Sequence, residues 1–146
     1  EKFGAELHVL PRIDETEIVA LMRNAHALIA TARTEGFGLT PMEAIMVGTP
    51  ALVVSDCGFT HTITDGWNGR RLPWPDTREG LEQWVEAIEQ AGDEANRAAW
   101  SKAGRERILN RFTANHQAEG LARSLAALGV DVETTELEML PGLDPA

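Results

Sequence analysis

Two glutamates separated by seven residues are the part of this sequence best suited to chemistry. Glu35 precedes a Gly-x-Gly turn and Glu43 follows it, within TEGFGLTPMEAIMVGTP at residues 34–50. Gly36 and Gly38 permit positive φ angles and let a ligand approach the backbone without a Cβ in the way. A helix that starts after the turn offers unpaired N–H groups and the positive end of its dipole. Two carboxylates beside such amides suit a ligand that carries hydroxyl groups and phosphates.

Each glutamate also has a purely structural interpretation. The letters TPME form a capping box, with Thr40 as N-cap, Pro41 at the first helical position and Glu43 reaching back to the Thr40 amide. Glu35 can be a solvent-exposed loop acid, and a single Gly-x-Gly turn is common in proteins. The spacing alone therefore leaves both a ligand site and a helix cap open.

Strands and helices alternate around this loop. Short apolar runs predict strands, of which the second and third are expected to be buried and parallel. The predicted strands occupy residues 6–10, 26–31, 51–55 and about 70–72. Periodic apolar positions and N-cap signals predict helices between and after these strands. The predicted helices begin at Asp14 with a capping box to Glu17, at Thr40 with an end at Gly48 and Pro50, at the capping-box pattern of residues 76–79, and then span 94–111 and 115–128. In the helix after residue 79, the expected core face is Leu81, Trp84, Val85 and Ile88.

This order predicts an α/β fold with a parallel sheet of three to four strands flanked by helices, and a helical C-terminal part. Ligands of such sheets bind beyond the carboxyl ends of the strands, where Glu35 is expected. Residues 1–128 are predicted to form one Rossmann-like domain that lacks its opening strands. Residues 129–146 hold five acidic residues and no basic one, so we expect a loosely packed tail.

Composition excludes several classes of function. The 13 basic and 23 acidic residues give a net charge of −10, which argues against a nucleic-acid partner because phosphate binding needs clustered Lys and Arg. No apolar run has the length of a membrane span. Cys57 is the only cysteine and fits a reducing compartment. We therefore expect a cytoplasmic protein, with peripheral membrane association left open for the full-length protein.

The segment EGFGLTPME resembles the Glu-x7-Glu motif of the retaining GT-B glycosyltransferases of family 4, also called glycosyl transferases group 1. The similarity covers roughly residues 7–112 and keeps the family's order: a strand into the motif, then EA and GTP, a strand, a glycine loop, DGWNG, and a Pro/Asp segment that opens a helix. The resemblance implies the donor-binding portion of an enzyme that moves a hexosyl unit from a nucleoside diphosphate sugar to a hydroxyl group. It also implies retention of anomeric configuration and no metal or other cofactor.

The resemblance also implies roles for single residues. Glu35 matches the catalytic-site glutamate that contacts the hydroxyls of the donor sugar. Thr40 matches the helix end that faces the diphosphate, and Glu43 matches the glutamate that binds the ribose of the nucleotide. The loop amides that line the sugar and the distal phosphate match Gly36, Phe37, Gly38 and Leu39.

The sequence departs from the family in two loops. Thr31-Ala32 stands where the family has Pro-Ser, and Gly58-Phe59 stands where it has Gly-Gly. Thr62 replaces an acidic residue, which puts the usual contacts of that second loop in doubt. His61 is interpreted as a partly exposed polar residue rather than a catalyst. Cys57 is interpreted as a small, partly buried hydrophobic residue rather than a reactive thiol.

Larger parts of the family's enzymes are absent from this sequence. The N-terminal acceptor domain is missing, as are the Arg and Lys that face the donor diphosphate. The nearest basic residues in sequence, Arg23 and Arg33, are not obvious substitutes. We therefore expect the chain alone to be inactive, because a large electrostatic contribution to the transfer is absent.

The expected partners are a nucleotide sugar, the missing N-terminal domain or a partner chain, and a second copy that pairs through an open sheet edge at residues 6–10. The alternative function is a non-catalytic α/β binding module or split subunit that keeps the GT-B core. A sugar-nucleotide epimerase of the same fold is a third interpretation.

Overall fold

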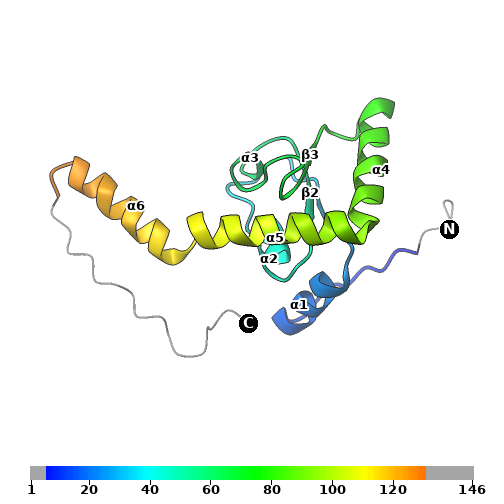
Figure 1. Ribbon diagram of the computed structural model, residues 1–146, viewed down its shortest axis with the longest axis horizontal. Helices are drawn as coiled ribbons and strands as arrows, with labels where there is room; N and C mark the ends of the chain where they lie inside the picture. Colours follow the sequence, from blue (N-terminus) through cyan, green and yellow to red (C-terminus); the bar gives the residue numbers. More distant parts are fainter. Residues whose placement is uncertain (1–5, 131–146) are drawn as a thin grey trace. The chain divides into compact units, whose positions relative to one another are not determined.

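The computed structural model describes residues 6–130, and the chain divides into two compact units, one up to Arg105 and one from Glu106. A three-stranded parallel sheet in the order β1-β2-β3 forms the centre of the first unit (Figure 1). Its strands are β1 (Leu28–Ala30), β2 (Ala51–Val54) and β3 (Gly69–Leu72). The predicted α/β fold, with a parallel sheet flanked by helices, is confirmed.

The two predicted buried strands differ in burial. All four residues of β2 are buried, as predicted. In β1, however, Ile29 is 50% exposed, although it pairs in register with Leu52 of β2, which is 0% exposed. The prediction of a buried strand at residues 26–31 is therefore correct in type but wrong in burial. Within the part of the chain that the structure describes, β1 is an edge strand that pairs with β2 alone. Edge position is not sufficient to expose a side chain, since Leu72 of the other edge strand, β3, is 0% exposed.

Residues 6–10 do not form the predicted strand. Leu7 and Val9 are 85% and 78% exposed. An extended segment becomes a strand by pairing with a neighbour, and the described residues provide none for it. The open edge expected at residues 6–10 is therefore formed by β1, and β3 is the other edge strand among the described residues.

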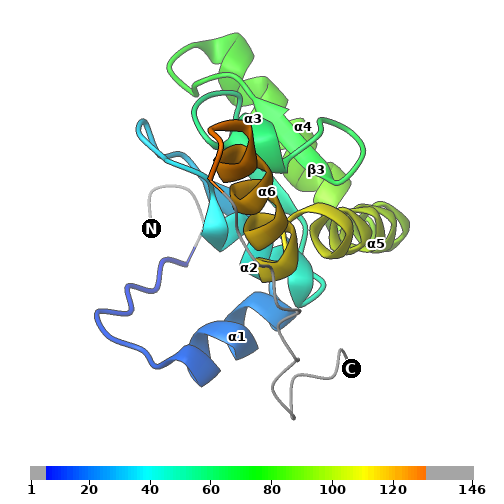
Figure 2. The same cartoon turned by 90° about the vertical axis from the view of Figure 1, so that its left-hand side faces the viewer.

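Helix α1 (Glu15–Asn24) has the predicted capping box, with the Asp14 carboxylate accepting from the Glu17 amide at 2.8 Å and the Asp14 amide donating to Glu17 at 3.0 Å. The Thr49 hydroxyl donates to the carbonyl of Met22 and so joins α1 to the end of α2. In two perpendicular views, α1 and α4 lie at opposite ends of the first unit (Figures 1 and 2).

Helix α2 (Leu39–Met46) connects β1 to β2 and contributes much of the core. Its end is the predicted glycine cap: Gly48 has φ +98°, and the amides of Gly48 and Thr49 donate to the carbonyls of Ile45 and Ala44. Two side chains of α5 (Glu94–Arg111) also bind this end, since Ser101 donates to the Gly48 carbonyl at 2.7 Å and Arg105 to the Met46 carbonyl at 2.9 Å.

After β2 the chain forms the short helix α3 (Phe59–Thr62), then β3, then α4 (Arg78–Gly92). Two details of α4 correct the sequence predictions. The N-cap is Thr77, which accepts from the Gly80 amide, and not Asp76 as the capping-box pattern implied. Trp84 is buried as predicted, and its indole N–H donates to the Pro73 carbonyl at 2.8 Å. The rest of the buried face is Gly80, Ala87 and Ala91, whereas the predicted Leu81, Val85 and Ile88 are 52%, 57% and 46% exposed. Small residues take the buried side because they let the helix approach closely: a Cβ on Gly80 would lie 2.6 Å from the Trp74 carbonyl oxygen, in the loop after β3.

The predicted helices at 94–111 and near 115–128 are present as α5 and α6 (Ala114–Ala127). Helix α6 lies in the second unit, and its N-cap Thr113 accepts from the His116 amide. Within residues 6–130, no helix is both long and apolar enough to cross a membrane. The division predicted at residue 129 stays a prediction, since most of that segment lies outside the described residues.

Candidate functional site

Three loops leave the carboxyl ends of the parallel strands and so gather at one edge of the sheet. They comprise residues 31–38 after β1, 55–58 after β2 and 73–77 after β3. Every site residue predicted from the sequence lies in the first loop or in the start of α2 that follows it. The geometry of this edge therefore decides whether those residues act together.

Glu35 is half-buried and is held by its own loop. Its Oε1 atom accepts hydrogen bonds from the amides of Phe37 at 3.3 Å and Gly38 at 3.1 Å. Its backbone carbonyl accepts from the Gly58 amide at 3.0 Å. The interpretation of Glu35 as a solvent-exposed loop acid is therefore wrong. Its Oε2 atom has no hydrogen-bond partner among residues 6–130, so one oxygen fixes the turn and the other is available to a ligand.

The loop after β2 packs closely beneath the glycine turn. A Cβ on Gly58 would lie 2.5 Å from both the Gly36 carbonyl oxygen and the Phe37 nitrogen, so only glycine fits at this position. Gly38 has φ +88° and lies over Phe59, whose ring would be 2.8 Å from an added Cβ. Of the two positions where the family has Gly-Gly, Gly58 is retained, so the two loops still approach each other closely. The second position holds Phe59, whose ring lies under the turn and is 1% exposed.

The start of α2 differs from the predicted capping box. Gly38 is the N-cap, without a side-chain cap, so Leu39 is the first helical residue and Thr40 the second. Thr40 is therefore not the N-cap, and the cap interaction predicted for Glu43 is absent among the described residues. The helix thus starts two residues earlier than predicted, at the left-handed Gly38, whose amide donates to the Glu35 carboxylate.

Leu39, Thr40 and Glu43 are exposed at the start of α2, while Pro41, Met42, Ala44 and Ile45 are buried. Residues three and four apart share a helix face, which brings the Glu43 carboxylate near the helix start. The amides of Leu39 and Thr40 have no intrahelical acceptor and no other acceptor within residues 6–130. Of the four loop amides predicted to line the sugar and the distal phosphate, those of Phe37 and Gly38 are bound by Glu35. Those of Gly36 and Leu39 have no acceptor within residues 6–130.

Two residues of the second loop region fit their sequence interpretations. Cys57 is partly buried, and its thiol donates to the Arg33 carbonyl at 3.0 Å. It also has φ +55°, uncommon for a residue with a side chain. His61 is exposed on α3, and Thr62 is buried with its hydroxyl directed to the Phe59 carbonyl at 3.3 Å.

One contact at this edge was not predicted. The guanidinium carbon of Arg33 lies 4.3 Å from the centre of the Trp74 ring, which joins the loop after β1 to the loop after β3. Arg33 precedes Glu35 by two residues, but nothing in the spacing pairs it with a tryptophan 41 positions later. Only the order of the strands brings the two together.

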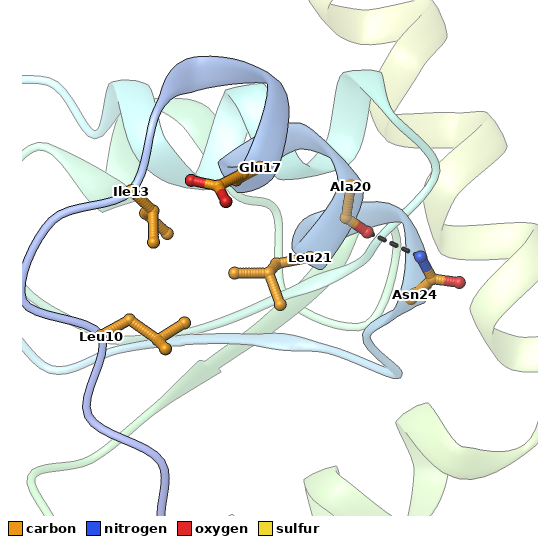
Figure 3. Close-up of a pocket in the computed structure, with 6 residues that line it drawn as sticks. All are labelled: Leu10, Ile13, Glu17, Ala20, Leu21 and Asn24. Carbon is orange, nitrogen blue, oxygen red and sulfur yellow. Dashed lines mark hydrogen bonds between the residues drawn. The ribbon is translucent and has the colours of Figure 1, made fainter.

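A hollow of about 360 Å³ lies elsewhere, beside α1 (Figure 3). Leu10, Ile13 and Leu21 point into it from two sides. None of the predicted site residues lines it. Glu17 and Asn24 also line it, but Glu17 accepts from the Asp14 amide and Asn24 donates to the Ala20 carbonyl, so both are engaged within α1 and its cap. Within residues 6–130, no three potential ligands are grouped as a metal would require.

Comparison with known proteins agrees with the sequence motif. Residues 5–134 match the family described as Family 4 Glycosyltransferase in conflict systems. The chain is 30% identical over 105 residues to the alpha-1,3/1,6-mannosyltransferase of Neurospora crassa, a match that covers 69% of the chain and 21% of that protein. It is 30% identical over 106 residues to the lipopolysaccharide glucosyltransferase WaaG of Escherichia coli, which covers 72% of the chain and 28% of that enzyme.

Two solved structures of sugar-transferring enzymes are also similar to this chain. The sucrose-phosphate synthase of Thermosynechococcus elongatus superposes with a TM-score of 0.65 and 27% identity, over 87% of this chain and 32% of that one. WaaG superposes with a TM-score of 0.58 and 25% identity, over 75% of this chain and 29% of that one. The chain therefore spans about a fifth to a third of the length of these relatives.

Proposed function

Since this chain belongs to the family 4 glycosyltransferases, we propose that it forms the donor-binding portion of a retaining enzyme that transfers a hexosyl unit from a nucleoside diphosphate sugar to a hydroxyl group. The observation that supports this most is the placement of Glu35 and Glu43 at the two sides of an open helix start. Between them lie the free amides of Leu39 and Thr40. Carboxylates accept hydrogen bonds from sugar hydroxyls, and helix-start amides donate to phosphate oxygens.

The two glutamates have different tasks in this proposal. Glu35 accepts hydrogen bonds from the donor sugar through the oxygen that does not hold the turn. Glu43 binds the ribose hydroxyls from the exposed face of α2. The amides and the helix dipole at the start of α2 face the diphosphate. No metal is assigned to the reaction, and a cytoplasmic location is part of the same proposal.

The remaining parts of the active site come from outside this chain. We propose that an N-terminal acceptor domain, or a partner chain that replaces it, closes the cleft over the donor and that the chain alone does not turn over. The second candidate is a non-catalytic binding module or split subunit with the same core. It is favoured by one observation: Glu35 already has a structural task in holding its loop.

A comparison of two Glu35 variants in the full-length enzyme tests the transferase proposal. Glu35→Gln keeps one carbonyl oxygen that can accept from the Phe37 and Gly38 amides, whereas Glu35→Ala removes it. If the carboxylate acts on the donor in the transition state, both variants lower kcat on the order of a hundredfold or more. If Glu35 only holds the loop, the glutamine variant keeps nearly full activity and the transferase role assigned to Glu35 is wrong.

Nucleotide titration of Glu43→Ala tests the ribose role separately. We expect weaker binding of nucleoside diphosphates even without the sugar, by about tenfold for a lost hydrogen bond to a charged group. The matched control is Glu106→Ala, an exposed glutamate on α5. Equal nucleotide affinity of the Glu43 variant and the control would remove Glu43 from the site.

A further inference from the structure

The stacked Arg33 and Trp74 side chains lie beside the Glu35 turn and have no role in the function proposed so far. The pair spans the edge of the sheet, because Arg33 follows β1, Trp74 follows β3, and β2 lies between these strands. The backbone of Arg33 is fixed as well, since its carbonyl accepts from the Cys57 thiol. All three strand-end loops therefore contribute to the position of this one guanidinium group.

The stacking leaves the hydrogen-bond donors of Arg33 unused. A guanidinium that lies flat on an aromatic ring uses its face, while its N–H groups point outward in the plane of the group. Arg33 is exposed, and its side chain has neither an ion pair nor a hydrogen bond within residues 6–130. Arg33 is thus a positive charge with a fixed backbone position and unused N–H donors.

Arg33 is also the only basic residue in the three loops, whose sequences are TARTEGFG, SDCG and PWPDT. Three other arginines lie on or beside these elements, and one of them, Arg71 of β3, has a buried Nε without a hydrogen-bond partner among the described residues. The other two have partners. Arg78 at the start of α4 binds Glu82 at 3.0 Å, and Arg70 of β3 binds Asp65 at 3.0 Å. An anion that enters this edge of a strongly acidic chain would meet Arg33 as an exposed counter-charge within the loops themselves.

We propose that Arg33, held against Trp74, binds the diphosphate of the nucleotide ligand of the Glu35–Glu43 site. This inference rests on the proposed function and adds the cation that the sequence did not reveal. Guanidinium groups bind phosphate oxygens through paired N–H donors. The contact with Trp74 restricts the rotamers of Arg33 before binding, so less entropy is lost when the phosphate arrives. Arg33 is then a binding residue, and Trp74 is a positioning residue.

Titration calorimetry on the 146-residue chain tests this. The probes are uridine and guanosine 5′-diphosphates and the corresponding nucleosides. Arg33→Ala is expected to weaken diphosphate binding about tenfold or more and to leave nucleoside binding unchanged, as for a lost charge-assisted hydrogen bond. Arg33→Lys keeps the charge without the planar group and should recover only part of the affinity. Trp74→Ala should weaken diphosphate binding less than Arg33→Ala, and Trp74→Phe should restore most of it.

The matched control is Arg23→Ala, which removes the same charge from an exposed position in the last turn of α1, just before the chain enters β1 at its amino end. Equal diphosphate affinities of the Arg33→Ala and Arg23→Ala variants overturn the inference alone. If neither diphosphate binds the wild-type chain, the proposed function is overturned and this inference with it. If Arg33→Ala has a lower melting temperature than wild type, the diphosphate affinity of the folded Arg33→Lys variant is compared with that of wild type instead. Equal affinities of these two proteins then overturn the inference.

Discussion

The strands β1 and β2 have nearly the same kind of sequence, LIA and ALVV, yet they differ in what surrounds them. Ile29 and Leu52 are neighbours in the same register of the sheet, but one is half-exposed and the other is fully buried. The second strand has a partner on both sides, and the first has a partner on one side among the described residues. Apolar composition therefore predicts that a segment is a strand, while its neighbours determine how much of it is buried.

The loops after these two strands differ in their roles. The loop after β1 carries the candidate ligand-binding groups, but it is supported by the loop after β2 through Gly58 and Cys57. The loop after the fully buried strand β2 thus supports the loop after the half-exposed strand β1, and the latter holds the candidate ligand-binding groups. This agrees with the general observation that functional loops are positioned by a rigid scaffold.

A pair of truncations gives the largest expected effect. Leu52→Ala should lower the free energy of unfolding by about 2–5 kcal/mol, because it leaves a cavity in a fully buried position. Ile29→Ala should cost about 1 kcal/mol or less, because half of the side chain is already in water. Urea unfolding of both variants measures the difference. Equal losses would mean that β1 is covered in solution and that the contrast between the strands is wrong.

The support of the first loop by the second is tested at Gly58. Gly58→Ala places a methyl group against backbone atoms that cannot rotate away, so we expect a loss of about 1–3 kcal/mol in stability. Gly36→Ala is the matched control, since an added Cβ meets no atom within 4 Å. Thermal melts compare the two. A Gly58 variant as stable as the Gly36 variant would show that the loops do not depend on each other.

The open edge of β1 predicts self-association of the isolated chain. Unpaired strand edges pair with another chain when nothing covers them, and a second copy of β1 across a two-fold axis is the simplest partner. Sedimentation at micromolar concentrations should detect concentration-dependent assembly. Ile29→Lys should weaken that assembly about tenfold, or about 1.4 kcal/mol, because a charge at an edge opposes pairing. A wild-type monomer whose melt is cooperative and independent of concentration would contradict the prediction.

The smallest effect is expected at Glu43, on the helix that joins the two strands. Its side chain caps nothing in the described structure, so Glu43→Ala should change stability by no more than about 0.5 kcal/mol. If Glu43 capped the helix, its replacement by Ala would lower the free energy of unfolding by about 0.5–2 kcal/mol. Thermal denaturation without nucleotide distinguishes these values, and a loss near the upper value would restore the capping interpretation.

Local signals were sufficient where the interacting groups are close in sequence. The capping box of Asp14 and Glu17, the glycine end of α2 at Gly48 and the limits of α5 all follow from residues within one or two turns of each other. The same signals failed where a distant or competing group took over. At the start of α2, the Glu35 carboxylate binds the amide of the left-handed Gly38, and Gly38 rather than Thr40 is the N-cap.

The sequence by itself determined the family, the parallel α/β fold and the segment that carries the candidate site, because a motif and its flanking periodicity are properties of the order of residues. Tertiary structure alone decided that β1 is half-covered, that α4 buries Gly80, Ala87 and Ala91, and that Arg33 stacks on Trp74. These features depend on which atoms from remote segments fill the same space. Packing depends on distances through space, and one sequence in isolation does not contain those distances explicitly.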